Sequence, residues 1–275
     1  EVILGQLIAD CRDEIVLSSK VGFPAGEDVN ARGLSRRHIM LSVDASLRRL
    51  GTDHLDLYFL HTFDPGTPIE EPLRALDDLV HQGKVLYPAV SNWAAWQIAT
   101  ALGISAREGL ARFVCIQPMY NLVKRQAEVE ILPLARAERL GVVSYSPLGA
   151  GLLTGKYGTT RRPEDGRLLW DPVYKQRYGD SVYYEIAERL TVHAQERGVH
   201  PASLAVAWVM SHPVITAPII GARNVEQLEA SLTALEVSMT PDWRAEISAL
   251  SIEPPSATDR SEEKSGIFYS GGKQA

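Results

Sequence analysis

The stretch LDLYFLHTFDP (Leu55–Pro65) combines a short apolar run with an ionisable residue at its end. Its first six residues, Leu55–Leu60, are mostly apolar, and His61 follows them at once. Short apolar runs rich in Leu, Val, Ile and aromatic residues and bounded by turn residues are typical of β-strands. The stretch therefore predicts a strand with a histidine at its carboxyl end.

The same pattern recurs in both directions from this stretch. Six apolar runs are predicted to be strands: Glu14–Ser19, Leu55–Leu60, Lys84–Ser91, Phe113–Gln117, Gly141–Ser146 and Val214–Ile220. Segments with a helical period lie between them, such as the one that has Ile39, Val43 and Leu47 after a helix-capping Ser35. This alternation predicts parallel strands joined by helices, because a tight turn cannot connect parallel neighbours.

Two α/β architectures fit the alternation: a (β/α)8 barrel and an open doubly wound sheet. The open nucleotide-binding sheet would be favoured by GxGxxG directly after a strand, and no such motif is present. The nearest segment, GAGLLTGKY (Gly149–Tyr157), lacks the third glycine and also fails the phosphate-loop pattern GxxxxGK[ST]. In a barrel, by contrast, polar residues at the carboxyl ends of the strands would meet at one mouth.

Composition limits the classes of function. The 28 Lys and Arg residues against 34 Asp and Glu give a formal net charge of −6 without long runs of either sign, so nucleic acid is not expected as a partner. Cys11 and Cys115 are too far apart for a redox CxxC motif or a zinc site, so no metal is expected. No stretch approaches the roughly 18 uncharged apolar residues of a membrane span, and we expect a cytoplasmic protein.

The length predicts a single domain over residues 1–275, with one large core. The first residues, EVILGQLIADC, have an amphipathic helical pattern, so the chain is expected to begin inside a fold. The last segment, residues 254–275, is rich in Pro, Ser and Gly and has no apolar period. It is predicted to be a C-terminal tail that lies over the domain or is partly disordered.

Six motifs, in their order and spacing, resemble the aldo-keto reductases. They are VLSSKVG (Val16–Gly22), LDLYFLHTFDP (Leu55–Pro65), GKVLYPAVSNW (Gly83–Trp93), IQPMYN (Ile116–Asn121), YSPLGAGLLTGKY (Tyr145–Tyr157) and IIGARNVEQLEASL (Ile219–Leu232). The resemblance implies a (β/α)8 TIM barrel that reduces aldehydes or ketones to alcohols, reversibly, by hydride transfer from the nicotinamide C4 of NADP(H). NAD(H) is the lesser alternative. The family uses Asp, Tyr, Lys and His, without a metal.

Lys20 and His61 match the catalytic lysine and histidine of the family. A cation beside a phenol lowers the pKa of a Tyr hydroxyl and makes it a better proton donor and acceptor. A histidine can hydrogen-bond the substrate carbonyl oxygen and orient it. Taken singly, Lys20 would be a solvated lysine at a strand end and His61 a hydrogen-bonded core histidine, but the ordered set of motifs favours the catalytic roles.

Three further residues match those that hold the nicotinamide carboxamide: Ser91, Asn92 and Gln117. Taken alone, Ser91 and Asn92 would indicate a turn or the N-cap of the next helix. Tyr145 matches the residue that stacks on the nicotinamide ring and so fixes the stereochemistry of transfer.

The phosphates of the cofactor are assigned to two segments. Ser146, Leu148, Gly151 and Lys156 lie in the loop that resembles the family's pyrophosphate-binding loop. The start of the helix after the last strand supplies Gly221, Arg223 and Gln227. Arg223 is the expected clamp for the 2′-phosphate, because a guanidinium suits a dianion.

The sequence departs from the family pattern in three places. The family's catalytic Asp and Tyr would precede Glu1, so the first two strands are expected to be absent from the chain, either as disordered residues or by truncation. Ala230 and Ser231 stand where the family often has a Glu-Asn pair that contacts the adenosine. Pro88 and Ala89 replace a usual Ile-Gly, and a proline removes one ladder donor from a parallel strand.

Two alternatives to a reductase stay open. One is a non-catalytic, redox-sensing nicotinamide-binding regulatory subunit, as the potassium-channel β-subunits of the family are. The other is a degenerate barrel without chemistry. The reductase would take a small-molecule carbonyl substrate, whose identity the sequence does not give. Trp93, Trp170 and the segment TTRRPEDGR (Thr159–Arg167) are expected to be pocket or lid elements.

Overall fold

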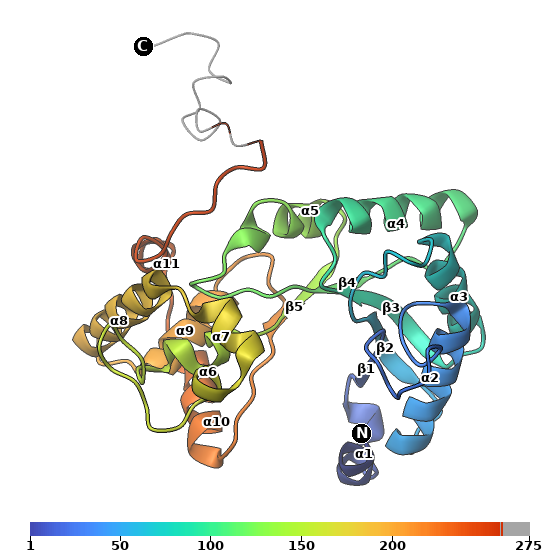
Figure 1. The fold of residues 1–275 in the computed structure, drawn as a ribbon, viewed down its shortest axis with the longest axis horizontal. Helices are drawn as coiled ribbons and strands as arrows, with labels where there is room; N and C mark the ends of the chain where they lie inside the picture. Colours follow the sequence, from blue (N-terminus) through green and yellow to red (C-terminus); the bar gives the residue numbers. More distant parts are fainter. Residues whose placement is uncertain (259, 261–275) are drawn as a thin grey trace. The chain divides into compact units, whose positions relative to one another are not determined.

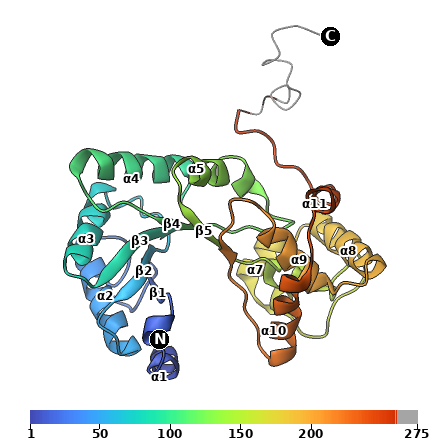
Figure 2. The same cartoon turned by 180° about the vertical axis from the view of Figure 1, so that it is seen from behind.

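The computed structural model describes residues 1–258 and 260, and the chain forms two compact units. The first unit consists of Glu1–Pro118 and Leu134–Gly141, and the second consists of Met119–Pro133 and Val142–Ala275. Figures 1 and 2 show their elements from opposite sides. The prediction of one domain over residues 1–275 stays a prediction. Most of the predicted tail, residues 259 and 261–275, lies outside the described residues.

Four parallel strands form the sheet of the first unit and pair in the order in which they occur in the chain. They are β1 (Ser18–Val21), β2 (Leu55–Leu60), β3 (Val85–Ser91) and β4 (Cys115–Gln117). Three crossover helices connect them: α2 (Arg36–Leu50), α3 (Glu70–His81) and α4 (Ala95–Glu108). The predicted alternation of parallel strands and helices is therefore confirmed in this unit (Figure 1).

The first strand begins later than the sequence predicted. Residues Arg12–Glu14 form a short 3-10 helix, η1, and β1 starts at Ser18 rather than Glu14. The Arg12 side chain explains the difference, because it donates to the Ile15 carbonyl oxygen at 3.0 Å and pairs with Asp56 at 2.9 Å. The segment before β1 is thus held by the Arg12 side chain, together with backbone bonds from the Asp56 and Leu57 amides to the Leu17 carbonyl oxygen.

Apolar packing on both sides of the sheet fixes the first unit. Helix α3 buries Leu73, Leu76 and Leu79 completely, and β2 buries Phe59 and Leu60. Helix α2 begins, as predicted, with the Ser35 hydroxyl accepting a hydrogen bond from the His38 amide. These contacts hold β1, β2 and β3 in place and so position the residues at their carboxyl ends.

Helix α1 (Val2–Ile8) confirms the helix predicted at the start of the chain. It buries Ile8 but leaves Ile3 and Leu7 exposed. Gly5 lies against the end of α2, where an added side chain would collide with the Leu50 carbonyl group. Pro88 lies in β3 without an amide to donate, and its carbonyl oxygen accepts a hydrogen bond from the Val114 amide at 3.0 Å.

The second unit contains a short parallel pair and most of the remaining helices. Strand β5 (Gly141–Ser144) pairs with β6 (Ala217–Pro218). Both strands are shorter than the predicted runs Gly141–Ser146 and Val214–Ile220. The other elements are η2 (Gln126–Glu128), α5 (Ile131–Ala137), which spans the boundary between the units, η3 (Gly149–Thr154), α6 (Arg167–Trp170), α7 (Pro172–Tyr178), α8 (Ser181–Glu196), α9 (Pro201–Met210), α10 (Val225–Leu232), η4 (Thr233–Glu236) and α11 (Pro241–Ser248).

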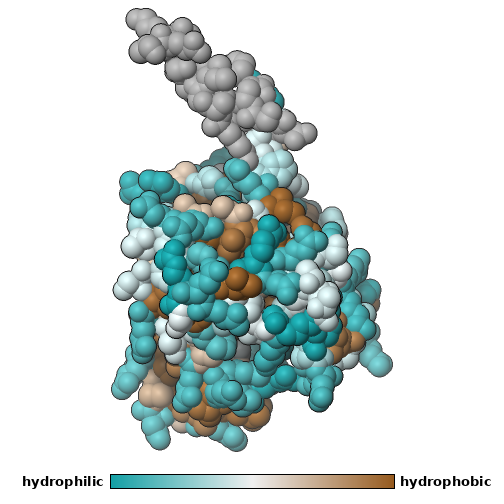
Figure 3. All heavy atoms as spheres, turned by 90° about the vertical axis from the view of Figure 1, so that its left-hand side faces the viewer, coloured by the Kyte–Doolittle hydropathy of each residue, from teal (hydrophilic) through white to brown (hydrophobic). Residues whose placement is uncertain are grey.

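Helix α9 is the core element of the second unit. It is apolar on all sides, and the residues from Ala202 to Val209 are all buried, as expected for a helix packed on every face. The face that carries α8 is mainly hydrophilic, with separate hydrophobic patches (Figure 3). In the part of the chain that the structure describes, no helix is both long and apolar enough to cross a membrane.

Candidate functional site

Lys20 and His61 lie at the carboxyl ends of neighbouring strands. Lys20 is in β1 opposite Phe59, and its Nζ lies 5.4 Å from the centre of the Phe59 ring. His61 directly follows β2, and its amide donates to the Val21 carbonyl oxygen at 2.8 Å. The parallel ladder between β1 and β2 therefore places the two predicted catalytic side chains at the same edge of the sheet.

Burial changes the proton affinity of both side chains. It lowers the pKa of Lys20 below its usual value. The pKa of His61 is also lowered, first by burial and then by the positive charge of Lys20. His61 is therefore a neutral imidazole near neutral pH, and its ring packs against Phe23 at a tilt of 41°, with 4.0 Å between the ring centres. A neutral imidazole can donate one hydrogen bond to a carbonyl oxygen without carrying a charge.

The predicted carboxamide residues also meet at strand ends. The Ser91 hydroxyl donates to the Gln117 carbonyl oxygen at 2.8 Å, which links β3 to β4. Asn92 has a left-handed backbone, with φ 56°, and its side-chain amide donates to the His61 carbonyl oxygen at 2.9 Å. The alternative in which Ser91 or Asn92 caps the next helix is wrong, because the N-cap of α4 is Ala94.

A cavity of about 610 Å³ lies in the second unit and is lined by all seven of the predicted phosphate-binding residues. The predicted residues that line it are Ser146, Leu148, Gly151, Lys156, Gly221, Arg223 and Gln227. Trp170 lines it too, as predicted for a pocket element. Tyr145 directly precedes the lining segment, and burial raises the pKa of its hydroxyl.

The loop at one wall of the cavity has an unusual backbone. Ser146 and Ala150 are left-handed, both with φ 58°, although neither is glycine. Such backbone is costly for residues with a Cβ and persists where neighbouring groups hold it. The buried Asn121 side chain does so here, since it donates to the Ser146 carbonyl oxygen at 2.9 Å. An added Cβ at Gly151 would meet nothing within 4 Å, so the backbone is open to the cavity there.

The start of α10 also lines the cavity. The Asn224 side chain accepts from the Gln227 amide at 2.9 Å, and the Gln227 side chain accepts from the Arg223 amide at 3.1 Å. These reciprocal bonds cap the helix and fix the backbone of Arg223. The Arg223 guanidinium contacts Asp165, with 2.9 Å between Nη1 and Oδ2.

The lining residues that were not predicted as individual site residues include two carboxylates, an arginine and a histidine: Asp165, Glu226, Arg167 and His200. Asp165 and Arg167 belong to the arginine-rich segment that was expected to form a lid. His200 caps α9 by accepting from the Ala202 amide at 3.1 Å, and a histidine before a proline gives no sign of a cavity in the sequence. Trp93 is buried against Phe63 and Phe113, and its prediction as a pocket element stays a prediction.

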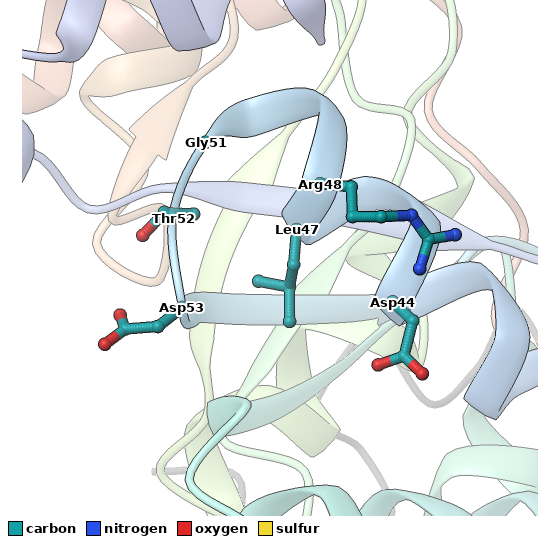
Figure 4. Close-up of a pocket in the computed structure, with 6 residues that line it drawn as sticks. All are labelled: Asp44, Leu47, Arg48, Gly51, Thr52 and Asp53. Carbon is teal, nitrogen blue, oxygen red and sulfur yellow. The ribbon is translucent and has the colours of Figure 1, made fainter.

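A second hollow lies in the first unit, at the end of the sheet opposite to Lys20 and His61. Its lining residues project from the last turns of α2 and the loop before β2, as Figure 4 shows. They are Asp44, Leu47, Arg48, Gly51, Thr52 and Asp53. The hollow lies at the amino end of β2, whereas His61 is at the carboxyl end, and it contains none of the predicted site residues.

Comparison with known proteins decides the family. The model of the Aldo/keto reductase family matches residues 1–252. The chain belongs to this family. Its predicted fold class, an α/β chain of the (β/α)8-barrel type, is thereby confirmed, and the parallel strands joined by helices agree with it.

Several relatives carry names of two kinds. A protein of Arabidopsis thaliana named "probable voltage-gated potassium channel subunit beta" is 37% identical over 244 residues, which are 86% of this chain and 74% of that protein. "Uncharacterized oxidoreductase YrpG" of Bacillus subtilis is 37% identical over 246 residues, or 87% of this chain and 73% of that protein. "L-glyceraldehyde 3-phosphate reductase" of Escherichia coli is 31% identical over 245 residues, or 85% and 68%. The family and the reductase-named relatives support an oxidoreductase that acts on carbonyl groups.

Proposed function

We propose that the protein is an NADP(H)-dependent reductase of aldehydes or ketones that acts in the cytoplasm. The observation that carries this proposal is the placement of Lys20 and His61 at the carboxyl ends of adjacent strands, with the pKa of each lowered by burial. The active sites of (β/α)8 enzymes are built at these strand ends. The reverse reaction, oxidation of an alcohol, uses the same groups.

Each of the two side chains has a defined part in the reaction. His61, as a neutral imidazole, donates a hydrogen bond to the substrate carbonyl oxygen and orients it. Lys20 is a half-buried cation that favours the ionised form of a neighbouring phenol and so assists proton transfer to the alkoxide. The family's tetrad also includes a Tyr and an Asp. When bound, NADPH supplies the hydride.

The cavity of the second unit fits the phosphates of a dinucleotide. Its volume of about 610 Å³ is in the usual range for ligand pockets, and Lys156, Arg167 and Arg223 contribute positive charge. An added Cβ at Gly151 or Gly221 would meet nothing within 4 Å, so a phosphate can approach the backbone there. Arg223 is suited to the 2′-phosphate, which favours NADP(H) over NAD(H).

The resemblance assigns the nicotinamide carboxamide to Ser91, Asn92 and Gln117, and the nicotinamide ring to Tyr145. The carboxamide needs a donor and an acceptor together, and Ser91, Asn92 and Gln117 offer hydroxyl and amide groups of both kinds. Ser91 and Asn92 are held in place by their bonds to the Gln117 and His61 carbonyl oxygens. Tyr145 would stack on the ring and fix which face is used.

The proposal is tested by measuring NADPH binding through the quenching of tryptophan fluorescence, because Trp170 lines the cavity. NADH is titrated alongside, and oxidation of NADPH is then measured with nitrobenzaldehyde. Tight NADPH binding with turnover is the expected result. Failure of the protein to bind either cofactor would overturn the proposal.

A second candidate function is a redox-sensing regulatory subunit that binds the nicotinamide without turning over a substrate. The observation that favours it is the 37% identity to the Arabidopsis thaliana protein named as a potassium channel subunit beta. Binding of NADPH without turnover of any aldehyde or ketone, in a protein that contains the family's Tyr and Asp, would select this candidate.

A further inference from the structure

Acidic and basic side chains both line the cavity of the second unit. Its lining includes three basic residues, Lys156, Arg167 and Arg223, and two acidic residues, Asp165 and Glu226. Arg223 comes from the wall before α10, whereas Asp165 comes from the segment Gly158–Arg167, which we name the strap. The two charges meet with 2.9 Å between Arg223 Nη1 and Asp165 Oδ2.

The strap is held to α8 independently of Arg223. The Thr159 amide and hydroxyl both donate to the Glu188 carboxylate. The Arg162 guanidinium lies over the Tyr184 ring, 3.9 Å from its centre. The position of Asp165 is therefore set by the packing of the strap as well as by its ion pair.

Gly166, the neighbour of Asp165, provides a second contact that holds the strap. An added Cβ at this glycine would collide with the Tyr157 hydroxyl, so the backbone lies directly on the buried Tyr157 side chain. This contact holds Asp165 at the edge of the cavity, where its carboxylate can reach Arg223. Removal of the carboxylate alone should consequently leave the strap in place.

We propose that Asp165 determines cofactor specificity by competing with the 2′-phosphate of NADP(H) for the Arg223 guanidinium. The inference rests on the proposed function of the cavity. A guanidinium binds a phosphate dianion through paired hydrogen bonds, and the contact with Asp165 involves one nitrogen and one oxygen. NAD(H) has no 2′-phosphate, so its binding leaves the Arg223–Asp165 pair intact. Asp165 thus weakens the binding of NADP(H) selectively.

The expected size of the effect follows from exposure. The side chains of Arg223 and Asp165 are 59% and 67% exposed, and exposed ion pairs contribute little to stability. Loss of such a pair corresponds to a change of about two- to fivefold in an equilibrium constant. Asp165 therefore narrows the preference for NADP(H) over NAD(H) without abolishing it.

The test compares Asp165→Asn with Glu226→Gln, which removes one negative charge from another lining residue of the same cavity. Dissociation constants for NADPH and NADH are measured by tryptophan fluorescence at low salt. Asp165→Asn is expected to bind NADPH about two- to fivefold more tightly and NADH unchanged. Glu226→Gln is expected to change the dissociation constants for NADPH and NADH by the same factor. A screened ion pair also predicts that the advantage of Asp165→Asn shrinks at about 1 M salt.

Either of two changes in cofactor affinity would overturn the proposal. If Asp165→Asn weakens both cofactors, the strap clamps the bound cofactor and does not compete with it. If Asp165→Asn tightens NADPH and NADH equally, as Glu226→Gln does, the effect is general electrostatics and not competition for Arg223.

Displacement of NADPH by 2′-AMP and 5′-AMP supplies a second measurement. Asp165→Asn is expected to bind 2′-AMP more tightly and to leave the affinity for 5′-AMP unchanged. Failure of the unaltered protein to bind NADPH or 2′-AMP would instead refute the proposed function. An unaltered protein that binds NADPH, with no change in Asp165→Asn, would refute only the role of Asp165.

Discussion

The two units position their functional side chains by different means. In the first unit, Lys20 and His61 are set by the backbone ladder between β1 and β2, above a sheet whose helices are packed by apolar residues. In the second unit, the cavity is walled by a loop with left-handed residues at Ser146 and Ala150 and by the strap, which side-chain contacts hold. Regular pairing thus fixes the proposed acid–base groups, whereas local side-chain contacts shape the proposed cofactor cavity.

The stabilising interactions differ in the same way. The core of the first unit is apolar, as in the fully buried Leu76. The second unit contains a polar cluster in which the Glu128 carboxylate accepts from the Tyr120 hydroxyl and from the Arg125 guanidinium, while Arg244 donates to the Tyr120 oxygen at 2.9 Å. The comparison leads to four predictions, given from the largest expected effect to the smallest.

Replacement of Lys20 by Met would test whether the strand ends of the first unit carry the chemistry. In a protein that contains the family's Tyr and Asp, turnover is expected to fall by about 10²- to 10⁴-fold, because the cation that favours the phenolate is lost. The dissociation constant for NADPH, measured by fluorescence, should change less than about twofold, since Lys20 is not among the residues that line the cavity.

Lys84→Met is the matched control, because Lys84 precedes β3 at the other end of the sheet and pairs with Asp44. It should leave turnover unchanged. Loss of NADPH binding with normal turnover in Lys20→Met would contradict the role given to Lys20.

The apolar core of the first unit is tested by Leu76→Ala in α3. The free energy of unfolding, from urea denaturation followed by circular dichroism, is expected to fall by about 2–5 kcal/mol, because a fully buried side chain leaves a cavity. Leu228→Ala in α10 of the second unit, where the side chain is 39% exposed, should cost less than about 1 kcal/mol. Equal losses in the two variants would show that burial does not distinguish these helices.

The polar cluster of the second unit is tested by Glu128→Gln. The change removes the charge that pairs with Arg125 and weakens the acceptor of the Tyr120 hydroxyl, so the free energy of unfolding should fall by about 2–3 kcal/mol. The exposed Glu130→Gln serves as the control and should change it by less than about 0.5 kcal/mol. A Glu128→Gln variant as stable as the control would mean that the cluster adds no net stability.

The smallest expected effect is the pH dependence of the free energy of unfolding, to which histidines of both units contribute. Burial lowers the pKa of His38 and His61 in the first unit and of His212 in the second. Just below the ordinary histidine value of about 6.5, the unfolded chain therefore binds more protons than the folded chain, and the free energy of unfolding rises with pH. Stability is lost as pH falls through this interval, and the dependence should flatten above it.

Urea denaturation at several values between about pH 5.5 and 7.5 would measure this slope. In His61→Gln the slope is expected to be smaller, because one histidine that the fold keeps neutral has been removed. A slope of opposite sign in the unaltered protein would show that these histidines are charged in the folded chain.

The sequence by itself determined the elements that have a strong local pattern. The apolar run Leu55–Leu60 became β2 with the predicted bounds, and Ser35 caps α2 as predicted. The placement of Lys20 and His61 at strand ends was likewise accessible, because a parallel ladder brings the ends of successive strands together. Composition and periodicity suffice for such elements since each residue's environment repeats along the element.

Only the tertiary structure decided the features that depend on contacts between distant residues. The start of β1 moved because Arg12 bonds to Asp56, and Trp93 is buried because Phe63 and Phe113 surround it. The pair of Asp165 with Arg223 joins residues far apart in the chain and has no local signature. Periodic patterns record which face of an element is buried, but they do not record which side chain from another element will lie against it.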